Sequence, residues 1–328
     1  MRYLVTGGAG FVGSHVVLAL AERGDQVVVL DDLRQGHRAA LPDGVLLIEH
    51  DLADAAAVNA VLADGPWDGV LHFAALSLVG ESMAQPFRYL LENGFNGIRL
   101  VEGCVRHGVP RFVLSSTANL FGTPEIVPIA EDAPLDPGSP YGESKWMIER
   151  ALLWAGRVHG LRSACLRYFN AAGADPLGRI GEDHRPETHL IPLAIDAALG
   201  RRSPLEVFGT DYDTPDGTCI RDYVHVSDLA DAHLMALERL DQGSVTYNLG
   251  NGAGYSVLDV IRAVEAVGGR KVPRALAPRR AGDPAVLVAA SERIRRETGW
   301  RTRFERLEDI VATAYAWREA HPAGYDEP

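Results

Sequence analysis

A glycine-rich turn near the N-terminus limits the folds that this chain can adopt. The apolar run from Arg2 to Thr6 predicts a strand, and it continues into Gly7-Gly8-Ala9-Gly10-Phe11-Val12-Gly13 and then into a helical pattern of apolar residues. Glycines at positions 7, 10 and 13 allow a tight turn, a close approach of a pyrophosphate to backbone N–H groups, and close packing of helix on strand. Strand, turn and helix in this order predict a dinucleotide-binding α/β fold.

The next predicted strand, Val27 to Leu30, ends at Asp31, which follows Gly13 by the roughly 20 residues expected for a ribose-binding carboxylate. A carboxylate at this position accepts both ribose hydroxyls of adenosine and repels a 2′-phosphate, so it favours NAD over NADP. Arg34 and Arg38 keep NADP open as an alternative, because guanidinium groups after this strand can bind that phosphate.

Three further strand-like runs, 45–49, 69–73 and 112–114, alternate with helical stretches. This alternation predicts the α/β class with a doubly wound parallel sheet, on which cofactors bind at the carboxyl ends of the strands. Beyond residue 170 the alternation becomes irregular. We therefore expect a Rossmann domain over 1–170 and a smaller α/β substrate-binding domain over 171–328, some of whose segments return to the first.

A second motif, Ser139-Pro140-Tyr141-Gly142-Glu143-Ser144-Lys145, places a phenol and an ammonium group one helical turn apart. Ser139 is a favourable helix cap and proline suits the first turn, so Tyr141 and Lys145 share one face, roughly 6 Å apart at Cβ. A fixed positive charge favours a phenolate. We therefore expect Lys145 to lower the pKa of Tyr141, and Thr117, after the predicted strand 112–114, to lie beside that phenol.

The composition argues against several functions. A net charge of −12 disfavours nucleic acid or an acidic membrane surface as the main partner. Apolar runs stay below the roughly 18 residues of a membrane span, and the N-terminus carries no secretory pattern, so we expect a cytoplasmic protein. Cys104, Cys165 and Cys219 are widely separated, which predicts buried thiols, and we expect no metal site.

Two groups of arginines are candidates for binding a diphosphate. Arg221 lies beside a strand-like run, where arginine commonly pairs with an acid, here Asp222 or Asp228; its functional alternative is a bidentate grip on a diphosphate. The positive residues between 270 and 280 are the densest such cluster in an acidic chain. They would attract a nucleotide electrostatically.

Longer strings now point to a family. They are Phe73-Ala74-Ala75, Val79-Gly80-Glu81-Ser82, Leu166-Arg167-Tyr168-Phe169-Asn170, Gly217-Thr218-Cys219-Ile220-Arg221-Asp222-Tyr223-Val224-His225-Val226, Tyr247-Asn248-Leu249-Gly250 and Arg279-Arg280-Ala281-Gly282-Asp283-Pro284. With the motifs above, they resemble the UDP-glucose 4-epimerases (UDP-galactose 4-epimerases) of the extended short-chain dehydrogenase/reductase superfamily. The resemblance implies an NAD-dependent isomerase that epimerises C4 of a UDP-hexose through a 4-keto intermediate.

The resemblance also implies residue roles. Catalytic positions are Tyr141, Lys145 and Thr117. Cofactor positions are Gly7, Gly10, Phe11, Val12, Gly13, Asp31, Asp32, Gln35, Gly36, Asp51, Leu52, Phe73, Ala74, Ala75, Ser77, Asn93, Ser115, Tyr141, Lys145 and Tyr168. Substrate positions are Thr117, Tyr141, Phe169, Asn170, His189, Leu190, Arg221, Arg280 and Asp283. The family analogy further implies a homodimer joined by helices around 90–107 and 141–156.

Some features depart from the family pattern or leave the substrate open. Ser77 stands where the family often has a lysine near the cofactor, and the stretch before Asn93 is one residue longer than expected. Leu287 occupies the position beside the C2 substituent of the sugar, where a larger aromatic residue would exclude N-acetyl sugars.

Two alternative functions therefore stay open: a 4-epimerase of another UDP-sugar (N-acetylhexosamine, pentose or uronate) and a non-catalytic NAD-sensing module. A dehydratase is disfavoured, because Ala118-Asn119 stand where that reaction needs an acidic pair.

Overall fold

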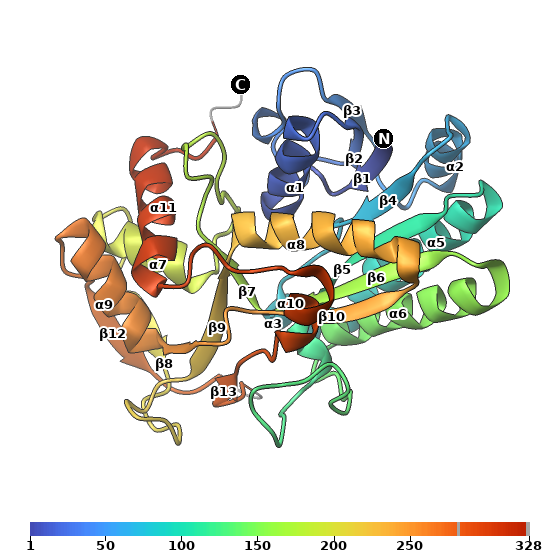
Figure 1. Cartoon of the computed structure of the whole chain (residues 1–328). Helices are drawn as coiled ribbons and strands as arrows, with labels where there is room; N and C mark the ends of the chain where they lie inside the picture. Colours follow the sequence, from blue (N-terminus) through green and yellow to red (C-terminus); the bar gives the residue numbers. More distant parts are fainter. Residues whose placement is uncertain (281–282, 326–328) are drawn as a thin grey trace.

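A seven-stranded sheet forms the centre of the larger half of the molecule in the computed structural model, which describes residues 1–280 and 283–325 (Figure 1). Its strands follow the order β10-β6-β5-β4-β1-β2-β3, and every neighbouring pair is parallel. Their bounds are β1 Arg2–Thr6, β2 Gln26–Asp31, β3 Leu46–Glu49, β4 Gly69–His72, β5 Arg111–Thr117, β6 Arg162–Tyr168 and β10 Val245–Leu249. The predicted doubly wound parallel sheet is confirmed.

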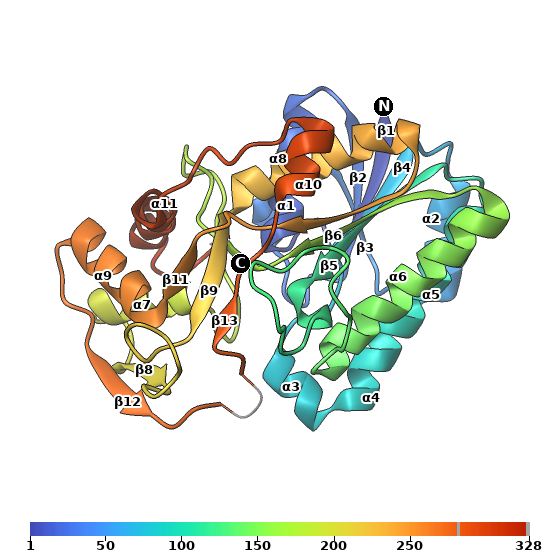
Figure 2. The same cartoon turned by 60° about the horizontal axis from the view of Figure 1, so that its bottom comes forward.

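Helices cover both faces of this sheet, and each face has its own core (Figure 2). Tyr3 and Val5 of β1 belong to one core and Leu4 to the other, because successive side chains of a strand point to opposite faces. The first face is covered by α1 Phe11–Glu22, α8 Val226–Arg239 and α10 Glu292–Thr298, and the second by α2 Ala55–Ala63, α5 Asn96–Arg106 and α6 Pro140–His159. Burial on both faces explains why the strands read as continuous apolar runs.

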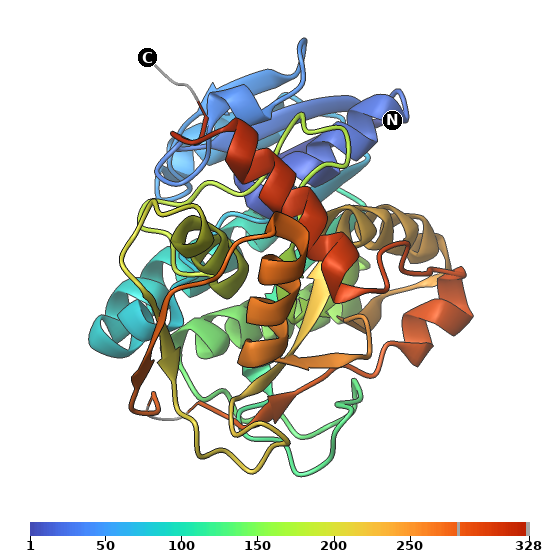
Figure 3. The same ribbon diagram turned by 90° about the vertical axis from the view of Figure 1, so that its left-hand side faces the viewer.

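The smaller half contains two small sheets packed against three helices (Figure 3). One sheet has the order β11-β9-β13, with β7 also paired to β9, and the other consists of β12 and β8. The bounds are β7 Asn170–Ala172, β8 Leu205–Phe208, β9 Ile220–His225, β11 Gly254–Ser256, β12 Arg274–Ala277, β13 Val286–Leu287, α7 Leu190–Ala198, α9 Val257–Gly268 and α11 Leu307–Ala320.

Short helical segments connect these elements. They are η1 Arg38–Ala40, α3 Val79–Ala84, α4 Pro86–Tyr89, the π-helical segment η2 Leu90–Phe95, η3 Ala118–Leu120 and η4 Leu240–Gln242. Among the residues that the structure describes, no helix has both the length and the apolar character needed to cross a membrane. Cys104, Cys165 and Cys219 are free and buried, as predicted.

One predicted strand is shorter than the observed one. The apolar pattern predicted a strand over 112–114, whereas β5 runs from Arg111 to Thr117. The polar residues Ser115 to Thr117 continue the pairing with β6, and all three are buried. Their side chains bond to other polar groups inside the protein, which a hydrophobic pattern does not reveal. This extension places Thr117 at the carboxyl edge of the sheet.

Candidate active site

The end of β5 and the start of α6 bring a threonine, a tyrosine and a lysine together. The side chain of Ser139 accepts a hydrogen bond from Gly142 N (3.2 Å) and caps α6, so the helix begins as predicted. One turn into the helix, the Lys145 side chain is 1% exposed, and its Nζ donates to the carbonyl oxygen of Ser115 at 2.9 Å. The Tyr141 phenol is hydrogen bonded to Thr117.

Burial dominates the electrostatics of this group. It raises the pKa of the Tyr141 phenol, and the hydrogen bond with Thr117 acts in the opposite direction. The effect of Lys145 on the pKa of Tyr141 stays a prediction. Burial lowers the pKa of Lys145 itself to about 8, because removing an ammonium ion from water disfavours the charged form.

Ser115 connects the lysine to a second tyrosine. Its hydroxyl lies 2.5 Å from the Tyr168 hydroxyl, while its carbonyl accepts from Lys145. The ring of Tyr168 also lies edge-on to the His233 imidazole, which packs on Phe73 at a centroid distance of 4.9 Å. Three predicted cofactor positions, Ser115, Lys145 and Tyr168, therefore lie together at one edge of the sheet, and Phe73 of the loop after β4 is linked to them through His233.

The glycine-rich turn is too close to neighbouring backbone for any side chain. Gly7 has φ of +69°, and a Cβ there would lie 2.2 Å from the backbone nitrogen of Ala74; a Cβ on Gly13 would lie 2.2 Å from the carbonyl oxygen of Gly7. The turn leads into α1, whose N-cap is Gly10. Because the first N–H groups of a helix have no partner within it, this helix end is suited to a pyrophosphate. The turn therefore fits the dinucleotide predicted from the sequence.

Asp31 lies beside the same turn, at the end of β2. Its two carboxylate oxygens accept from the backbone nitrogens of Ala9 and Leu33, each at 3.0 Å. Burial raises the pKa of this carboxyl, and the two N–H groups oppose that shift. A Cβ on Gly36 would lie only 3.0 Å from the carboxylate, so this loop also approaches it closely.

The neighbouring arginines are engaged with acids. Arg34 lies 2.7 Å from the carboxylates of Asp32 and Asp51 and 2.6 Å from that of Glu92. Arg38 pairs with Glu49 at 3.5 Å. Since three carboxylates surround Arg34, binding a 2′-phosphate there would require displacing them. The NADP alternative therefore loses its main support.

Asn93 lies in the π-helical segment η2. A π-helix accommodates an extra residue within a helix, and it lies in the stretch that is expected to be one residue longer than the family pattern. The buried amide of Asn93 accepts from Leu76 N and donates to Leu76 O, both at 2.8 Å, and also contacts Ser144 Oγ at 3.3 Å. The Asn93 amide therefore holds the loop after β4 in position. Ser77 lies on this loop and is exposed.

Two of the substrate positions of the smaller half, Arg221 and Asp283, lie together. Arg221 forms a short ion pair with Asp283, so the predicted partners Asp222 and Asp228 are wrong. Those two acids instead accept backbone N–H groups at 2.7–3.1 Å. Leu287 is the register partner of Arg221 and packs in one apolar cluster with Phe169, which lies close to the end of β5. Ala281 and Gly282 of the arginine motif lie outside the described residues.

Other candidate residues take separate positions. Arg280 stacks on the ring of Phe208 at 4.1 Å, and Arg279 is paired with Asp211. His189 precedes α7, which begins at Leu190, and its Nδ1 lies 2.7 Å from Glu182 Oε1. Sequence reasoning missed Glu182, His184 and Glu187, which gather around His189. The signal was present as the spacing Glu-x-His-x-x-Glu-x-His.

Comparisons with known proteins agree with this geometry. Residues 3–250 match the model of the NAD dependent epimerase/dehydratase family. A curated UDP-glucose 4-epimerase from Azospirillum brasilense is 51% identical over 97% of this chain and 92% of its own. A crystal structure of a UDP-glucose 4-epimerase superposes with a TM-score of 0.96 at 44% identity, covering both chains completely. The enzyme from Bifidobacterium longum, solved in complex with NAD+ and UDP, superposes with a TM-score of 0.94 at 36% identity, over 99% of this chain and 100% of that one. The chain therefore belongs to the NAD dependent epimerase/dehydratase family, and its similarity to UDP-glucose 4-epimerases extends over nearly its whole length.

Proposed function

We propose that this chain catalyses the reversible C4 epimerisation of UDP-glucose and UDP-galactose through a 4-keto sugar, with NAD as a bound cofactor. The observation that carries this proposal is the contact of Thr117 with the Tyr141 phenol at the sheet edge where the glycine turn opens. The 51% identity to a UDP-glucose 4-epimerase supports it. Incubating the purified protein with UDP-galactose and following UDP-glucose tests it. Retention of NAD without interconversion would instead favour a sensing module.

The residues that would hold NAD are the glycine turn, for the pyrophosphate, and Asp31, for the adenosine ribose. When bound, NAD accepts a hydride from C4 of the sugar and returns it, so the overall reaction involves no net oxidation. The remaining proposed cofactor contacts, carried over from the resemblance, are Asp32, Gln35, Gly36, Asp51, Leu52, Phe73, Ala74, Ala75, Ser77, Asn93, Ser115, Lys145 and Tyr168.

Tyr141 and Thr117 carry the proton chemistry in this proposal. Tyr141, starting as the phenolate, takes the proton from O4 of the sugar and later returns it, so it acts first as base and then as acid. Thr117 stabilises the phenolate, because its hydrogen bond lowers the pKa of Tyr141. Lys145 is held by the Ser115 carbonyl one helical turn behind the phenol, where it positions the ribose side of the cofactor by analogy with the family.

Removing the Thr117 hydroxyl tests its effect on Tyr141. We expect Thr117→Val to lower kcat by about tenfold, the equivalent of one hydrogen bond of roughly 1–1.5 kcal/mol. Because Thr117 lowers the pKa of Tyr141, the pH profile of kcat should also move to higher pH. Steady-state rates between pH 6 and pH 10 would show this shift, and an unchanged profile would contradict it. Thr246→Val, in strand β10, is the matched control.

The diphosphate and uridine are proposed to bind to the smaller half. Arg221, held by Asp283, and Arg280 would bind the diphosphate, since guanidinium groups recognise phosphate oxygens bidentately. Phe169, Asn170, His189 and Leu190 complete the proposed UDP-sugar contacts. In this division, residues 1–170 hold NAD and carry Thr117, Tyr141 and Lys145, and residues 171–328 hold most of the UDP-sugar, apart from segments such as β10 that pair in the large sheet.

Leu287 is proposed to set the tolerance for C2 substituents. We expect Leu287→Tyr to lower kcat/KM for UDP-N-acetylgalactosamine at least tenfold relative to UDP-galactose, because bulk in an apolar pocket discriminates by roughly 10–200-fold. The ratio of the two kcat/KM values is the measurement. The same change at the exposed Leu276 of β12 is the control and should leave the ratio unchanged. An unchanged ratio in the first variant would place the C2 substituent elsewhere.

We propose a homodimer that joins the η2, α5 and α6 surfaces of two copies. Large apolar side chains are exposed there: Phe87, Leu91 and Phe95 before α5, and Leu153, Trp154 and Val158 on α6. Leu91 and Trp154 are 59% and 54% exposed. Contiguous exposed apolar patches mark interaction sites.

The free, buried cysteines fit a reducing compartment, and we propose that the enzyme acts in the cytoplasm.

Charge reversal on this surface tests the dimer. We expect the double variant Leu91→Glu, Trp154→Glu to elute as a monomer. Each copy brings two new carboxylates, so a symmetric dimer would have to desolvate four of them in its interface. Size-exclusion chromatography with light scattering measures the mass. Leu177→Glu, at an exposed leucine on another part of the surface, is the control and should keep the wild-type mass. A wild type that is monomeric at micromolar concentration would contradict the proposal.

A further inference from the structure

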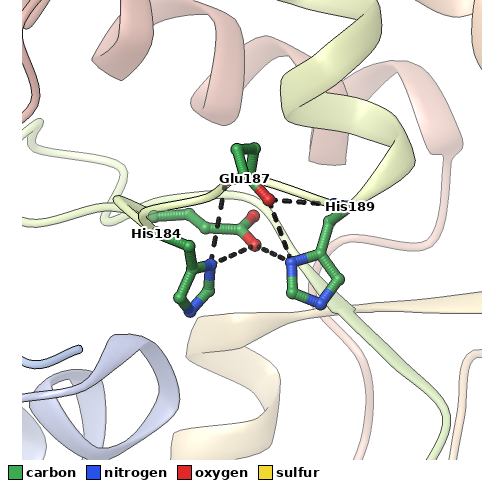
Figure 4. A group of neighbouring side chains, drawn as sticks. His184, Glu187 and His189 are labelled. Carbon is green, nitrogen blue, oxygen red and sulfur yellow. Dashed lines mark hydrogen bonds and ion pairs between the residues drawn. The ribbon is translucent and has the colours of Figure 1, made fainter. Parts of the chain in front are cut away.

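Four side chains of the segment before α7 converge on one point. Glu182, His184, Glu187 and His189 each direct one potential ligand atom inward, and these atoms all lie within 4.8 Å of one another. Figure 4 shows the imidazole rings of His184 and His189 turned toward the Glu187 carboxylate from opposite sides. Neither the cofactor nor the proton chemistry proposed above uses Glu182, His184 or Glu187.

The distances match those between the ligands of a four-coordinate metal ion. His189 Nδ1 lies 2.7 Å from Glu182 Oε1 and 3.2 Å from Glu187 Oε1, and His184 Nδ1 lies 3.2 Å from Glu182 Oε1 and 3.8 Å from Glu187 Oε2. Zinc bonds to nitrogen and oxygen of ~2.0–2.1 Å place tetrahedral ligand atoms about 3.3 Å apart. The four measured distances lie on both sides of that value.

Hydrogen bonds within the cluster do not account for all of its atoms. Within residues 1–280 and 283–325, Glu182 Oε1, His184 Nδ1 and Glu187 Oε2 are buried and find no aligned hydrogen-bond partner. Glu182 is 4% exposed, so its carboxylate requires compensation from nearby positive charge. His184 Nδ1 lies 3.2 Å from Glu182 Oε1 and 3.8 Å from Glu187 Oε2, and both distances are longer than the ~2.7–2.9 Å of a well-formed charge-assisted hydrogen bond.

Two protonated histidines are the competing explanation. The carboxylates do raise the pKa of His184, to about 9, and that of His189. Arg318 also approaches, with Nη1 3.9 Å from Glu187 Oε2, although its guanidinium is bound mainly to Asp196 at 2.5 and 3.0 Å. An ion-pair cluster would balance the charge, yet it leaves His184 Nδ1 at these long distances from both carboxylates.

The cluster lies where the two halves of the chain meet. The His184 ring stands edge-on to the ring of Phe11, the first residue of α1, at 6.2 Å. On the other side, His189 immediately precedes α7. Gln35 Nε2 donates to the carbonyl of Arg185 at 3.1 Å, which ties the same segment to the loop after β2. Holding residues 182–189 rigid would therefore hold the smaller half of the molecule in place against the glycine-rich turn before α1.

We propose that Glu182, His184, Glu187 and His189 bind one divalent transition-metal ion of the zinc class, and that the ion holds residues 182–189 between α1 and α7. Two imidazole nitrogens and two carboxylate oxygens suit zinc and its first-row neighbours rather than magnesium or calcium. The protein supplies four ligands, which is the pattern of structural rather than catalytic zinc. The ion takes no part in hydride or proton transfer, and because it uses Nδ1 of His189 it leaves Nε2 for the UDP-sugar contact proposed above.

Metal content and thermal stability of the full-length protein test this site. After chelation and dialysis, the wild type should take up about one zinc per chain by mass spectrometry, with a melting temperature about 4 °C higher at a zinc concentration near 100 times Kd. Cobalt in its place should give the visible band of a tetrahedral ion. His184→Gln should bind zinc at least about 100-fold more weakly, since losing even an outer partner costs 10–100-fold.

His159→Gln is the matched control, because this histidine is exposed at the end of α6 and should leave zinc binding unchanged. Circular dichroism establishes that each variant is folded. If His184→Gln is unfolded, Glu187→Gln and the chelated wild type replace it. A folded wild type that takes up less than one tenth of an ion per chain would overturn the proposal and leave an ion-pair cluster. Equal zinc binding by His184→Gln and the wild type would also overturn it.

Discussion

Replacing Tyr141 by phenylalanine is expected to lower kcat by about 10²–10⁴-fold, the usual contribution of a positioned acid or base. The substitution removes only the phenol oxygen, which we propose takes the O4 proton. Since each tenfold change corresponds to about 1.4 kcal/mol, this is a loss of roughly 3–5 kcal/mol of transition-state stabilisation. The ring remains, so the apolar contacts of Tyr141, including its edge-on contact with Tyr89 at 6.5 Å, are retained.

Conversion of UDP-galactose to UDP-glucose, with NAD content measured on the same sample, gives the result. Tyr89→Phe is the matched control, because it removes a buried phenol from the neighbouring ring, whose hydroxyl donates to Glu81 at 2.7 Å. That variant should retain most of the activity. Near-full turnover by Tyr141→Phe, with NAD bound, would show that another group is the base. A loss of both turnover and NAD would assign Tyr141 to cofactor binding.

The parts of the site that sequence predicted well depend on local backbone requirements. Gly7 and Gly13 are needed because a side chain at either would overlap backbone atoms at 2.2 Å, and this requirement is visible as a glycine pattern between a strand and a helix. The cap of α6 is equally local, since Ser139 bonds to Gly142 three residues later. Such short-range rules identify the fold and the position of the cofactor turn.

The parts of the site that the sequence predicted poorly depend on how deeply a side chain is buried and on partners that are far away in the sequence. Helical spacing placed Lys145 on the face of Tyr141, but it could not show that the ammonium is buried and bound to the Ser115 carbonyl. Likewise, Arg221 pairs with Asp283, which is far away in the sequence, rather than with a near neighbour. The choice between NAD and NADP also needed the tertiary structure, which places three carboxylates around Arg34.

Acid is expected to destabilise this protein by several kcal/mol between pH 7 and pH 5. Four histidines are buried, and burial lowers the pKa of each: to about 4 for His15 and His233, and to about 3 for His72 and His225. An unfolded histidine titrates near ~6.5. Between the folded and unfolded pKa the unfolded chain binds more protons, so this stability is complete above about pH 6.5 and is lost as the pH falls toward the folded pKa.

The expected loss is about 2 kcal/mol per histidine at pH 5, or roughly 8 kcal/mol for all four. Another group opposes it. Burial raises the pKa of Asp222 to about 6. This carboxyl binds more protons in the folded state and regains about 1 kcal/mol over the same interval. The net loss of about 7 kcal/mol is comparable with the total stability of many proteins, roughly 5–15 kcal/mol.

Urea unfolding at pH 7 and pH 5 measures this loss as the change in extrapolated free energy of unfolding. His233→Leu isolates one contribution, because the ring is fully buried and packs on Phe73 and Tyr168. Leucine does not titrate, so the variant should lose about 2 kcal/mol less than the wild type between the two pH values, whatever its absolute stability. His159→Leu, at the exposed end of α6, should lose as much as the wild type. Equal losses in all three proteins would mean that His233 is protonated within the fold, and buried histidines would then not explain the acid sensitivity.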